Sequence, residues 1–217
     1  MDSNAQDHVV AFIDIGTNSI RLLLVRVEPN GATTTLSVQK ETVRLGEAEF
    51  INGYLQAAAM QRAAAVCEQF AEMARSNNAN EIVAVATSAT REAKNKREFL
   101  SMLKDQTGLS VRVISGIEEA RLIYLGISHG YDLGGQTVLM IDIGGGSTEL
   151  IVGDQKEYDH LDSVKLGAIR LATMFFGIDE TGPISRETYD RIKEYVKNST
   201  VRSLQKIDEL DYDMVLG

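Results

Sequence analysis

Residues 138–151 read VLMIDIGGGSTELI. The apolar run Val138–Ile141 has the length and composition of a buried strand, and a second apolar run resumes at Leu150. Three glycines, then Ser147, Thr148 and Glu149, separate the two runs. The stretch therefore predicts a strand, a tight glycine turn and a second strand. No Lys follows the glycines, which excludes the phosphate loop of nucleoside triphosphatases.

The turn itself has the composition of a phosphate site. Gly144, Gly145 and Gly146 lack Cβ atoms and permit positive φ, so backbone N–H groups can converge on a phosphate. Asp142 and Glu149 flank them and would repel a bare phosphate. Together they indicate a hard cation, which takes oxygen ligands and bridges to phosphate. The alternative, a plain β-hairpin, needs fewer glycines and leaves both carboxylates unexplained.

Composition limits the classes of protein that need considering. A chain of 217 residues, 44% of them hydrophobic, can form one large or two small domains with a real core. Its formal net charge of -9 disfavours general nucleic-acid binding, which demands a basic surface. A polyanionic ligand would need a metal ion or local Arg and Lys to compensate that charge.

Several further site types are disfavoured by single residues. Cys67 is the sole cysteine, so an intramolecular disulfide is excluded, and its place on an apolar helical stripe predicts a buried thiol. His8, His129 and His160 show no zinc-ligand spacing. The polar, acidic N-terminus does not resemble a signal peptide, and no apolar run is long enough to span a membrane. We therefore expect a cytoplasmic protein that binds no membrane.

The turn has a counterpart near the N-terminus. Residues 10–19 (VAFIDIGTNS) align with residues 138–147 (VLMIDIGGGS), and Asp14 matches Asp142. This repeat predicts two related domains that face each other, each with one phosphate turn. We call residues 14–19 the first phosphate turn and residues 142–149 the second phosphate turn.

A predicted helix ends the first domain. Ser115 followed by Glu118 matches a capping box, with Ser115 as N-cap and Glu118 reaching back to it. Glu119 lies about 100° further around the helix and has no such structural role. The helix is expected to end near His129. We therefore predict a first domain of residues 1–129 and a second of residues 130–217.

One arginine stands out from a basic cluster. Arg91 follows the predicted strand Glu81–Ala86 directly, and in open α/β sheets ligands gather at the carboxyl edge of the strands. Position alone leaves a phosphate-binding and a structural role equally open for Arg91. Lys94, Lys96 and Arg97 fit the solvated face of a helix better.

The remaining elements follow from periodicity and turn signals. The apolar stripe of Gln56–Arg75 predicts a core-facing helix. The other predicted strands are Val9–Ile15, Ile20–Val27, Thr33–Leu45, Val111–Ile114, Tyr158–Leu166 and Asp213–Leu216, and the other predicted helices are Gly167–Phe176 and a long helix from Ser185 to about Leu210.

Four motifs occur in one order: DIGTNS, ATSATREAKN, SGIEEARLI and MIDIGGGSTEL. Together they resemble the exopolyphosphatase and guanosine pentaphosphate phosphohydrolase family, of the actin, Hsp70 and sugar-kinase superfold. The resemblance extends over essentially the whole chain. It implies an α/β protein with two ribonuclease-H-like (actin-like) domains around a cleft. The family continues well past a strand like Asp213–Leu216, so the second domain is expected to be incomplete in this chain.

The resemblance also implies a reaction, the Mg²⁺-dependent hydrolysis of a terminal phosphoanhydride. Glu119 matches the general base, and Asp142 and Glu149 match carboxylates associated with the metal and with water. Asp14, the counterpart of Asp142, joins the candidate ligands of Mg²⁺ or another divalent cation. The candidate phosphate contacts are Thr17, Asn18, Ser19, Arg91, Gly144, Gly145, Gly146 and Ser147.

Two other functions stay open at this point. A phosphotransferase or ATPase of the same superfold shares the Asp-x-Gly hairpins, and a nucleotide-binding module could bind without turnover. The expected ligand is polyphosphate or a guanosine penta- or tetraphosphate, with no preference between them. A homodimer is left open.

Overall fold

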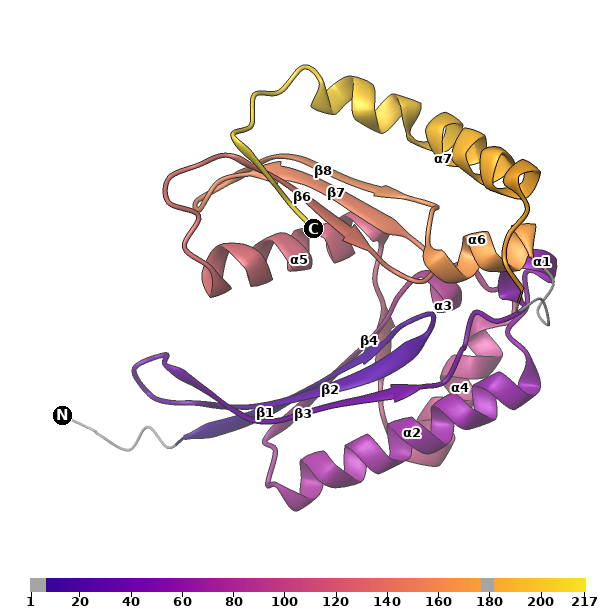
Figure 1. The fold of residues 1–217 in the computed structure, drawn as a ribbon. Helices are drawn as coiled ribbons and strands as arrows, with labels where there is room; N and C mark the ends of the chain where they lie inside the picture. The colour runs from indigo at the N-terminus through magenta and orange to yellow at the C-terminus, as the bar shows by residue number, and fades with distance from the viewer. Residues whose placement is uncertain (1–6, 177–181) are drawn as a thin grey trace. The chain divides into compact units, whose positions relative to one another are not determined.

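The computed structural model describes residues 7–176 and 182–217, and the contacts among its residues divide the chain into two compact units, 1–113 and 114–217 (Figure 1). Each unit is an α/β structure with its own mixed sheet. The α/β class expected from the sequence is confirmed.

The first unit is built on a five-stranded sheet of order β3-β2-β1-β4-β5. Strands β1 (His8–Ile15), β2 (Ser19–Val27) and β3 (Thr33–Thr42) are antiparallel neighbours. Strands β4 (Glu81–Ala86) and β5 (Val111–Val113) run parallel to β1. The parallel pairing of β1 and β4 brings their carboxyl ends to one edge, where Ile15 lies beside Ala86.

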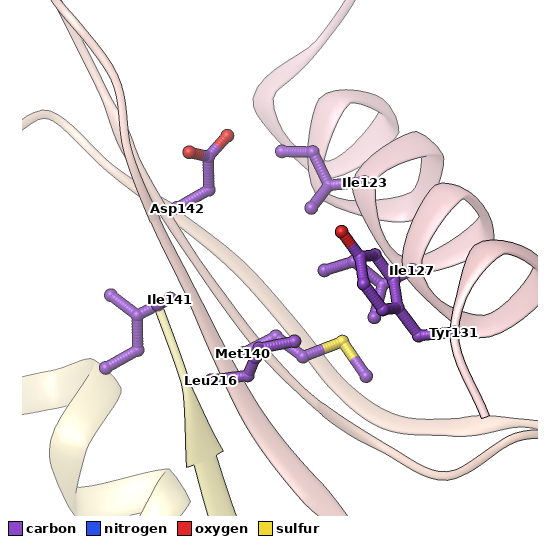
Figure 2. Close-up of a pocket in the computed structure, with 8 residues that line it drawn as sticks. Ile123, Ile127, Tyr131, Met140, Ile141, Asp142 and Leu216 are labelled. Carbon is purple, nitrogen blue, oxygen red and sulfur yellow. The ribbon is translucent and has the colours of Figure 1, made fainter. Parts of the chain in front are cut away.

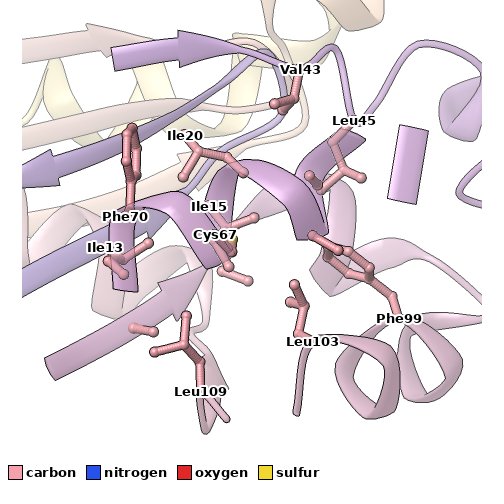
Figure 3. Close-up of a cluster of buried hydrophobic side chains, with 14 of the residues drawn as sticks. Ile13, Ile15, Ile20, Val43, Leu45, Cys67, Phe70, Phe99, Leu103 and Leu109 are labelled. Carbon is pink, nitrogen blue, oxygen red and sulfur yellow. The ribbon is translucent and has the colours of Figure 1, made fainter. Parts of the chain in front are cut away.

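Two long helices cover one face of this sheet. Helix α2 (Ala57–Ser76) and helix α4 (Lys96–Thr107) pack on each other, and the core between them and the strands is fully buried. Alternate residues of the strands supply one side of this core, because the pleat points every second side chain to the same face. Figure 3 shows the cluster, which includes Ile13, Ile15, Ile20, Cys67, Phe70, Phe99 and Leu103.

The second unit contains a four-stranded sheet of order β8-β7-β6-β9. Strands β6 (Val138–Ile143), β7 (Thr148–Gly153) and β8 (Tyr158–Val164) are antiparallel neighbours, and β9 (Met214–Leu216) runs parallel to β6. Two separate buried clusters form on its two faces. Within this unit, helix α5 (Gly116–Gly130) covers one face and helix α7 (Arg186–Ile207) the other, while α6 (Ala168–Phe175) follows β8 (Figure 1).

The unit boundary differs from the expected one. The compact units meet between Val113 and Ile114, whereas the sequence placed the boundary at 129–130. The difference is α5, which packs against the second sheet. Its Tyr124 hydroxyl donates to the Asp154 carbonyl at 3.1 Å, and its ring meets that of Tyr158 edge-on. The local sequence of α5 does not show which sheet the helix packs against, because that sheet is formed by residues further along the chain.

Most predicted elements begin and end within a few residues of the predicted bounds, but two short helices were not predicted. The short helices α1 (Glu49–Asn52) and α3 (Ser88–Glu92) fall in stretches where no element was predicted. Strand β3 also ends at Thr42 instead of Leu45. There the N–H groups of Val43 and Arg44 both turn to the Asn18 carbonyl at 2.9 Å, and Arg44 adopts a left-handed φ of 51°.

No helix within the described ranges is long and apolar enough to cross a membrane.

The buried position of Cys67 has a testable consequence. Its thiol is 0% exposed, and burial raises its pKa to about 12. Because the thiolate is the reactive form, native protein at pH 8 should react with Ellman's reagent only as fast as it unfolds, while the same protein in guanidinium reacts at once. Rapid stoichiometric labelling of the native chain would show that α2 does not pack as described.

Candidate functional site

The second phosphate turn is a β-hairpin, as expected. Strands β6 and β7 pair so that Asp142 lies directly opposite Glu149 and Ile143 opposite Thr148. The Gly144 N–H closes the turn by donating to the Ser147 carbonyl at 3.0 Å. A Cβ on Gly144 would lie 3.1 Å from that same carbonyl oxygen, so the tight closure favours glycine.

The carbonyl groups of the glycines are all turned toward the start of α6. The Gly144 carbonyl accepts from the Ala168 N–H at 3.0 Å. The Gly145 carbonyl accepts from the N–H groups of Ile169 and Arg170 at 2.9 and 3.0 Å. The third carbonyl, of Gly146, accepts from the Arg170 Nε–H at 2.7 Å.

This arrangement fixes where the next amides point. In a trans peptide the C=O and the following N–H point in opposite directions, and the described residues contain no cis peptide. The N–H groups of Gly145, Gly146 and Ser147 therefore point away from α6. None of the three donates to another described residue. Successive backbone amides turned to one side are an arrangement that binds anions in many proteins.

The glycines reach this geometry without the backbone freedom that the sequence suggested. None of Gly144, Gly145 and Gly146 has a positive φ, whereas five glycines elsewhere in the described chain do. The positive φ that glycine permits is therefore not used at these positions. What the turn uses is the missing Cβ at Gly144, which lets the hairpin close tightly, while Gly146 and Ser147 are buried.

A row of polar side chains crosses the sheet below the turn. Asp142, Glu149 and Ser163 are cross-strand neighbours on β6, β7 and β8. Ser163 Oγ donates to Glu149 Oε1 at 2.8 Å. Glu149 is only 1% exposed, whereas Asp142 is exposed. The two carboxylates thus have different environments, one buried and hydrogen-bonded and the other open.

The buried carboxyl has a strongly altered acidity. The pKa of Glu149 is raised from 4.5 to about 7, mainly by burial and then by the nearby carboxylates of Glu119 and, more weakly, Asp142, against the lowering effect of hydrogen bonds from Ser163 and Ser147. Glu119 of α5 is therefore close enough to Glu149 to act on it electrostatically. A carboxyl group with a raised pKa that lies close to other carboxylates, as Glu149 does, is typical of functional sites.

The start of α5 has the N-cap that the sequence predicts. Ser115 is the N-cap, and its Oγ accepts from the Glu118 N–H at 3.1 Å. The N-cap prediction is confirmed. Because α5 packs on the same sheet face as Met140, it carries Glu119 on the side of the Asp142–Glu149 row.

An apolar pocket of about 260 Å³ lies beside Asp142, and Figure 2 shows its lining. Its walls come from α5, β6 and β9, and Asp142 is the only acidic residue of the lining, which consists of Ile123, Ile127, Tyr131, Met140, Ile141, Asp142, Leu216 and Gly217. The pocket keeps one side of the Asp142 side chain open to solvent.

The donors present suit a magnesium ion only in part. No group of three His, Cys, Asp or Glu side chains in the described part of the chain is arranged to hold a metal. Mg²⁺, however, is usually bound by one or two carboxylates together with substrate phosphates and water. The exposed Asp142 fits a direct ligand. Glu149 is buried and already accepts from Ser163, so it fits a water-mediated contact better.

The first phosphate turn repeats this plan in the first unit. The Gly16 N–H donates to the Ser19 carbonyl at 3.1 Å, as Gly144 does to Ser147. The Thr17 carbonyl accepts from Gly46, and the Asn18 carbonyl accepts from residues 43 and 44. By the same peptide geometry, the N–H groups of Asn18 and Ser19 point away from residues 43–46. Asp14 lies beside Arg21 of β2 in this hairpin.

Arg91 lies in α3, at the same edge as the first phosphate turn. The Thr87 N–H before α3 donates to the Ile15 carbonyl at 3.2 Å, which ties the two segments together. A Cβ on Gly46 would touch both Thr17 and Ala89, so this glycine allows the turn and α3 to approach. The structure thus brings Thr17, Asn18 and Ser19 to the edge that carries Arg91. Asp14 belongs to the first unit.

Three residues that contact the second phosphate turn or its carboxylates were not predicted: Ser163, Gly167 and Arg170. Each acts through a tertiary contact with residues 14 to 24 positions away, so no local pattern marks it. A glycine and an arginine three residues apart after a strand, in LGAIR, are the only trace in the sequence.

The family of this chain follows from a comparison with known proteins, which agrees with the fold and the two hairpins. The model of the Ppx/GppA phosphatase family matches residues 24–213, and the chain belongs to this family. The family resemblance stated from the four motifs is confirmed.

Two curated relatives are each about one-third identical to the chain. The guanosine-5'-triphosphate,3'-diphosphate pyrophosphatase of Photobacterium profundum is 33% identical over 217 residues, which is all of this chain and 43% of that protein. Exopolyphosphatase 1 of Mycobacterium tuberculosis is 34% identical over 170 residues, 78% of this chain and 49% of that protein. The chain therefore spans less than half the length of these relatives.

A solved structure shares the fold. The crystal structure of an exopolyphosphatase from Cytophaga hutchinsonii superposes with a TM-score of 0.90 at 27% identity, over 96% of this chain and 65% of that one.

The raised pKa of Glu149 predicts a pH-dependent stability. The folded chain keeps this proton up to about pH 7, whereas the unfolded chain loses it near pH 4.5. The folded state binds more protons between these values, so the free energy of unfolding should fall as pH rises through this window, by about 3 kcal/mol at most. Glu149→Gln should remove that loss.

Urea unfolding at pH 5 and pH 8, without divalent cations, measures this slope. Glu72→Gln, at an exposed position of α2, is the matched control and should keep the wild-type slope. Equal slopes in wild type and Glu149→Gln would contradict the burial-induced shift.

Proposed function

We propose that this chain carries the phosphate-binding and hydrolytic groups of a phosphoanhydride hydrolase, which releases the terminal phosphate of inorganic polyphosphate, guanosine pentaphosphate or both. One observation supports the proposal most: three outward amides lie directly beside a row of carboxylates. Membership of a phosphatase family and relatives named for these two substrates support it further. The cytoplasmic location and the homodimer stay predictions from the sequence.

Phosphate binding is assigned to the two turns separately. In the second unit, the N–H groups of Gly145, Gly146 and Ser147 donate to the oxygens of the phosphate to be released. Such donors stabilise the charge that spreads over these oxygens during phosphoryl transfer. In the first unit, the amides of Asn18 and Ser19 and the Arg91 side chain are assigned to substrate phosphates, whereas the Thr17 hydroxyl is buried and is given no such contact.

The two carboxylates of the second phosphate turn are assigned to a magnesium ion, which compensates the negative charge of the substrate phosphates. Asp142 holds Mg²⁺ directly, and Glu149 does so through water. The bound ion supplies neutralisation of phosphate charge and polarisation of the phosphoanhydride oxygens. Asp142 and Glu149 would otherwise repel the substrate, since each is acceptor-only when ionised.

Glu119 is assigned the proton transfer. Ser115 and Glu118 begin α5 and hold its first turn, which places Glu119 on the side of the sheet that carries Asp142 and Glu149. There Glu119 accepts a proton from the attacking water as the phosphoanhydride bond breaks. Ser163, which donates to Glu149, keeps the buried carboxyl from competing for the same water.

The proposed function is tested by phosphate release from sodium tripolyphosphate, long-chain polyphosphate and guanosine pentaphosphate, each with Mg²⁺ and with EDTA. We expect Mg²⁺-dependent release from at least one of them, with ¹⁸O from labelled water in the phosphate. Transfer to glycerol or glucose in place of water would indicate a phosphotransferase instead. Binding of all three without release would indicate a binding module.

The two adjacent glutamates give the sharpest comparison. Glu119→Gln keeps the size of the side chain and removes the base, so turnover should fall about 10²–10⁴-fold while the substrate Kd changes little. Glu118→Gln should be nearly silent, because Gln also serves at this position of a capping box. Steady-state phosphate release by both variants decides the assignment, and it fails if Glu118→Gln is the inactive one.

A further inference from the structure

The proposed function assigns no role to the buried side chain of Arg170. Arg170 is 8% exposed, lies behind the second phosphate turn and would not touch a phosphate on its outward side. We propose that Arg170 is the positioning residue of this turn and that Gly167 makes its approach possible. Together they hold the three amides in the orientation that binds phosphate, which rests on the proposed phosphate contact of this turn.

The hydrogen bonds explain how the orientation is held. A glycine turn without side chains can rotate its peptide planes at little cost, because glycine tolerates a wide range of φ and ψ. Here the start of α6 binds the carbonyls of Gly144 and Gly145 through backbone N–H groups, and Arg170 binds the third carbonyl through its side chain. Only this third contact depends on the identity of a side chain.

The Arg170 contact also acts through charge. A guanidinium at 2.7 Å from the Gly146 carbonyl polarises that peptide, so the Ser147 N–H at its other end becomes a stronger donor to an anion. The side chain sits on the opposite side of the turn from the ligand. It therefore acts on the turn without occupying the space of the phosphate.

Gly167 allows this arrangement by its size. A Cβ on Gly167 would lie 2.4 Å from both the carbonyl carbon and the oxygen of Gly145, and 2.5 Å from the Gly146 nitrogen. These are backbone atoms, so they cannot move aside without moving the turn. The backbone of Gly167 is extended, with φ -166°, so the requirement for glycine is one of contact and not of conformation.

The test measures the amides themselves. Uniformly ¹⁵N-labelled chain is titrated with sodium tripolyphosphate, with and without Mg²⁺, and its amide spectrum is recorded. In the wild type, the signals of Gly145, Gly146 and Ser147 should shift together and saturate. In Arg170→Gln, these signals should shift before any ligand is added, and the Kd should rise about 10–100-fold, the usual effect of losing a charged hydrogen bond.

Three further variants separate positioning from general stability. Arg170→Lys keeps the charge but cannot reproduce the Nε–H contact, and should recover part of the affinity. Arg202→Gln, at an exposed site of α7, is the matched control and should bind as the wild type does. Gly167→Ala should weaken binding at least as much as Arg170→Gln. Its control is Gly126→Ala in α5, where a Cβ would meet nothing within 4 Å.

The outcomes distinguish this inference from the function on which it rests. If the wild-type amides do not respond to tripolyphosphate, the phosphate contact of the turn is wrong. If they respond and Arg170→Gln and Gly167→Ala bind with wild-type Kd, the positioning role is wrong. Should Arg170→Gln fail to fold, Arg170→Lys decides the matter, because wild-type affinity in that variant contradicts a role for the Nε–H contact. In phosphate release, a positioning role raises KM more than it lowers kcat.

Discussion

The second phosphate turn depends on hydrogen bonds made behind it. The start of α6 binds the carbonyl groups of Gly144, Gly145 and Gly146, and this leaves the following three N–H groups pointing outward. A tight glycine turn alone would only permit such an arrangement. The helix selects it, so the ligand-binding surface is decided by residues that do not touch the ligand. Under the proposed function, the neighbouring carboxylates restrict the ligands to phosphates accompanied by a cation.

The same construction occurs in both units, although the residues that complete it differ. Each hairpin is closed by a glycine N–H that donates to a serine carbonyl three residues on. In the first unit the carbonyls of the turn are bound by backbone N–H groups of residues 43–46, and in the second by α6 and Arg170. The two hairpins therefore share the hydrogen bonds that close the turn and hold its carbonyls. The segments that bind these carbonyls, residues 43–46 and α6, have no common sequence.

Local sequence predicted what depends on local chemistry. The hairpins, the strand Glu81–Ala86, the N-caps Ser115 and Ser185 and the buried Cys67 follow from periodicity, turn residues and capping. The side of the sheet on which α5 packs and the contacts of Arg170 depend on chain segments far apart, so they could not be read from sequence. The glycines of the second phosphate turn do not use the positive φ that they permit, because tertiary hydrogen bonds to α6 set the conformation of the turn.

The central claim is that the outward amides of the second phosphate turn bind a phosphate group. A crystal structure of the chain with tripolyphosphate and Mg²⁺ tests it most directly. The account predicts phosphate oxygens within about 3.2 Å of the nitrogens of Gly145, Gly146 and Ser147, with Asp142 at the cation. A well-defined phosphate bound elsewhere, with these three amides facing only solvent, would contradict it.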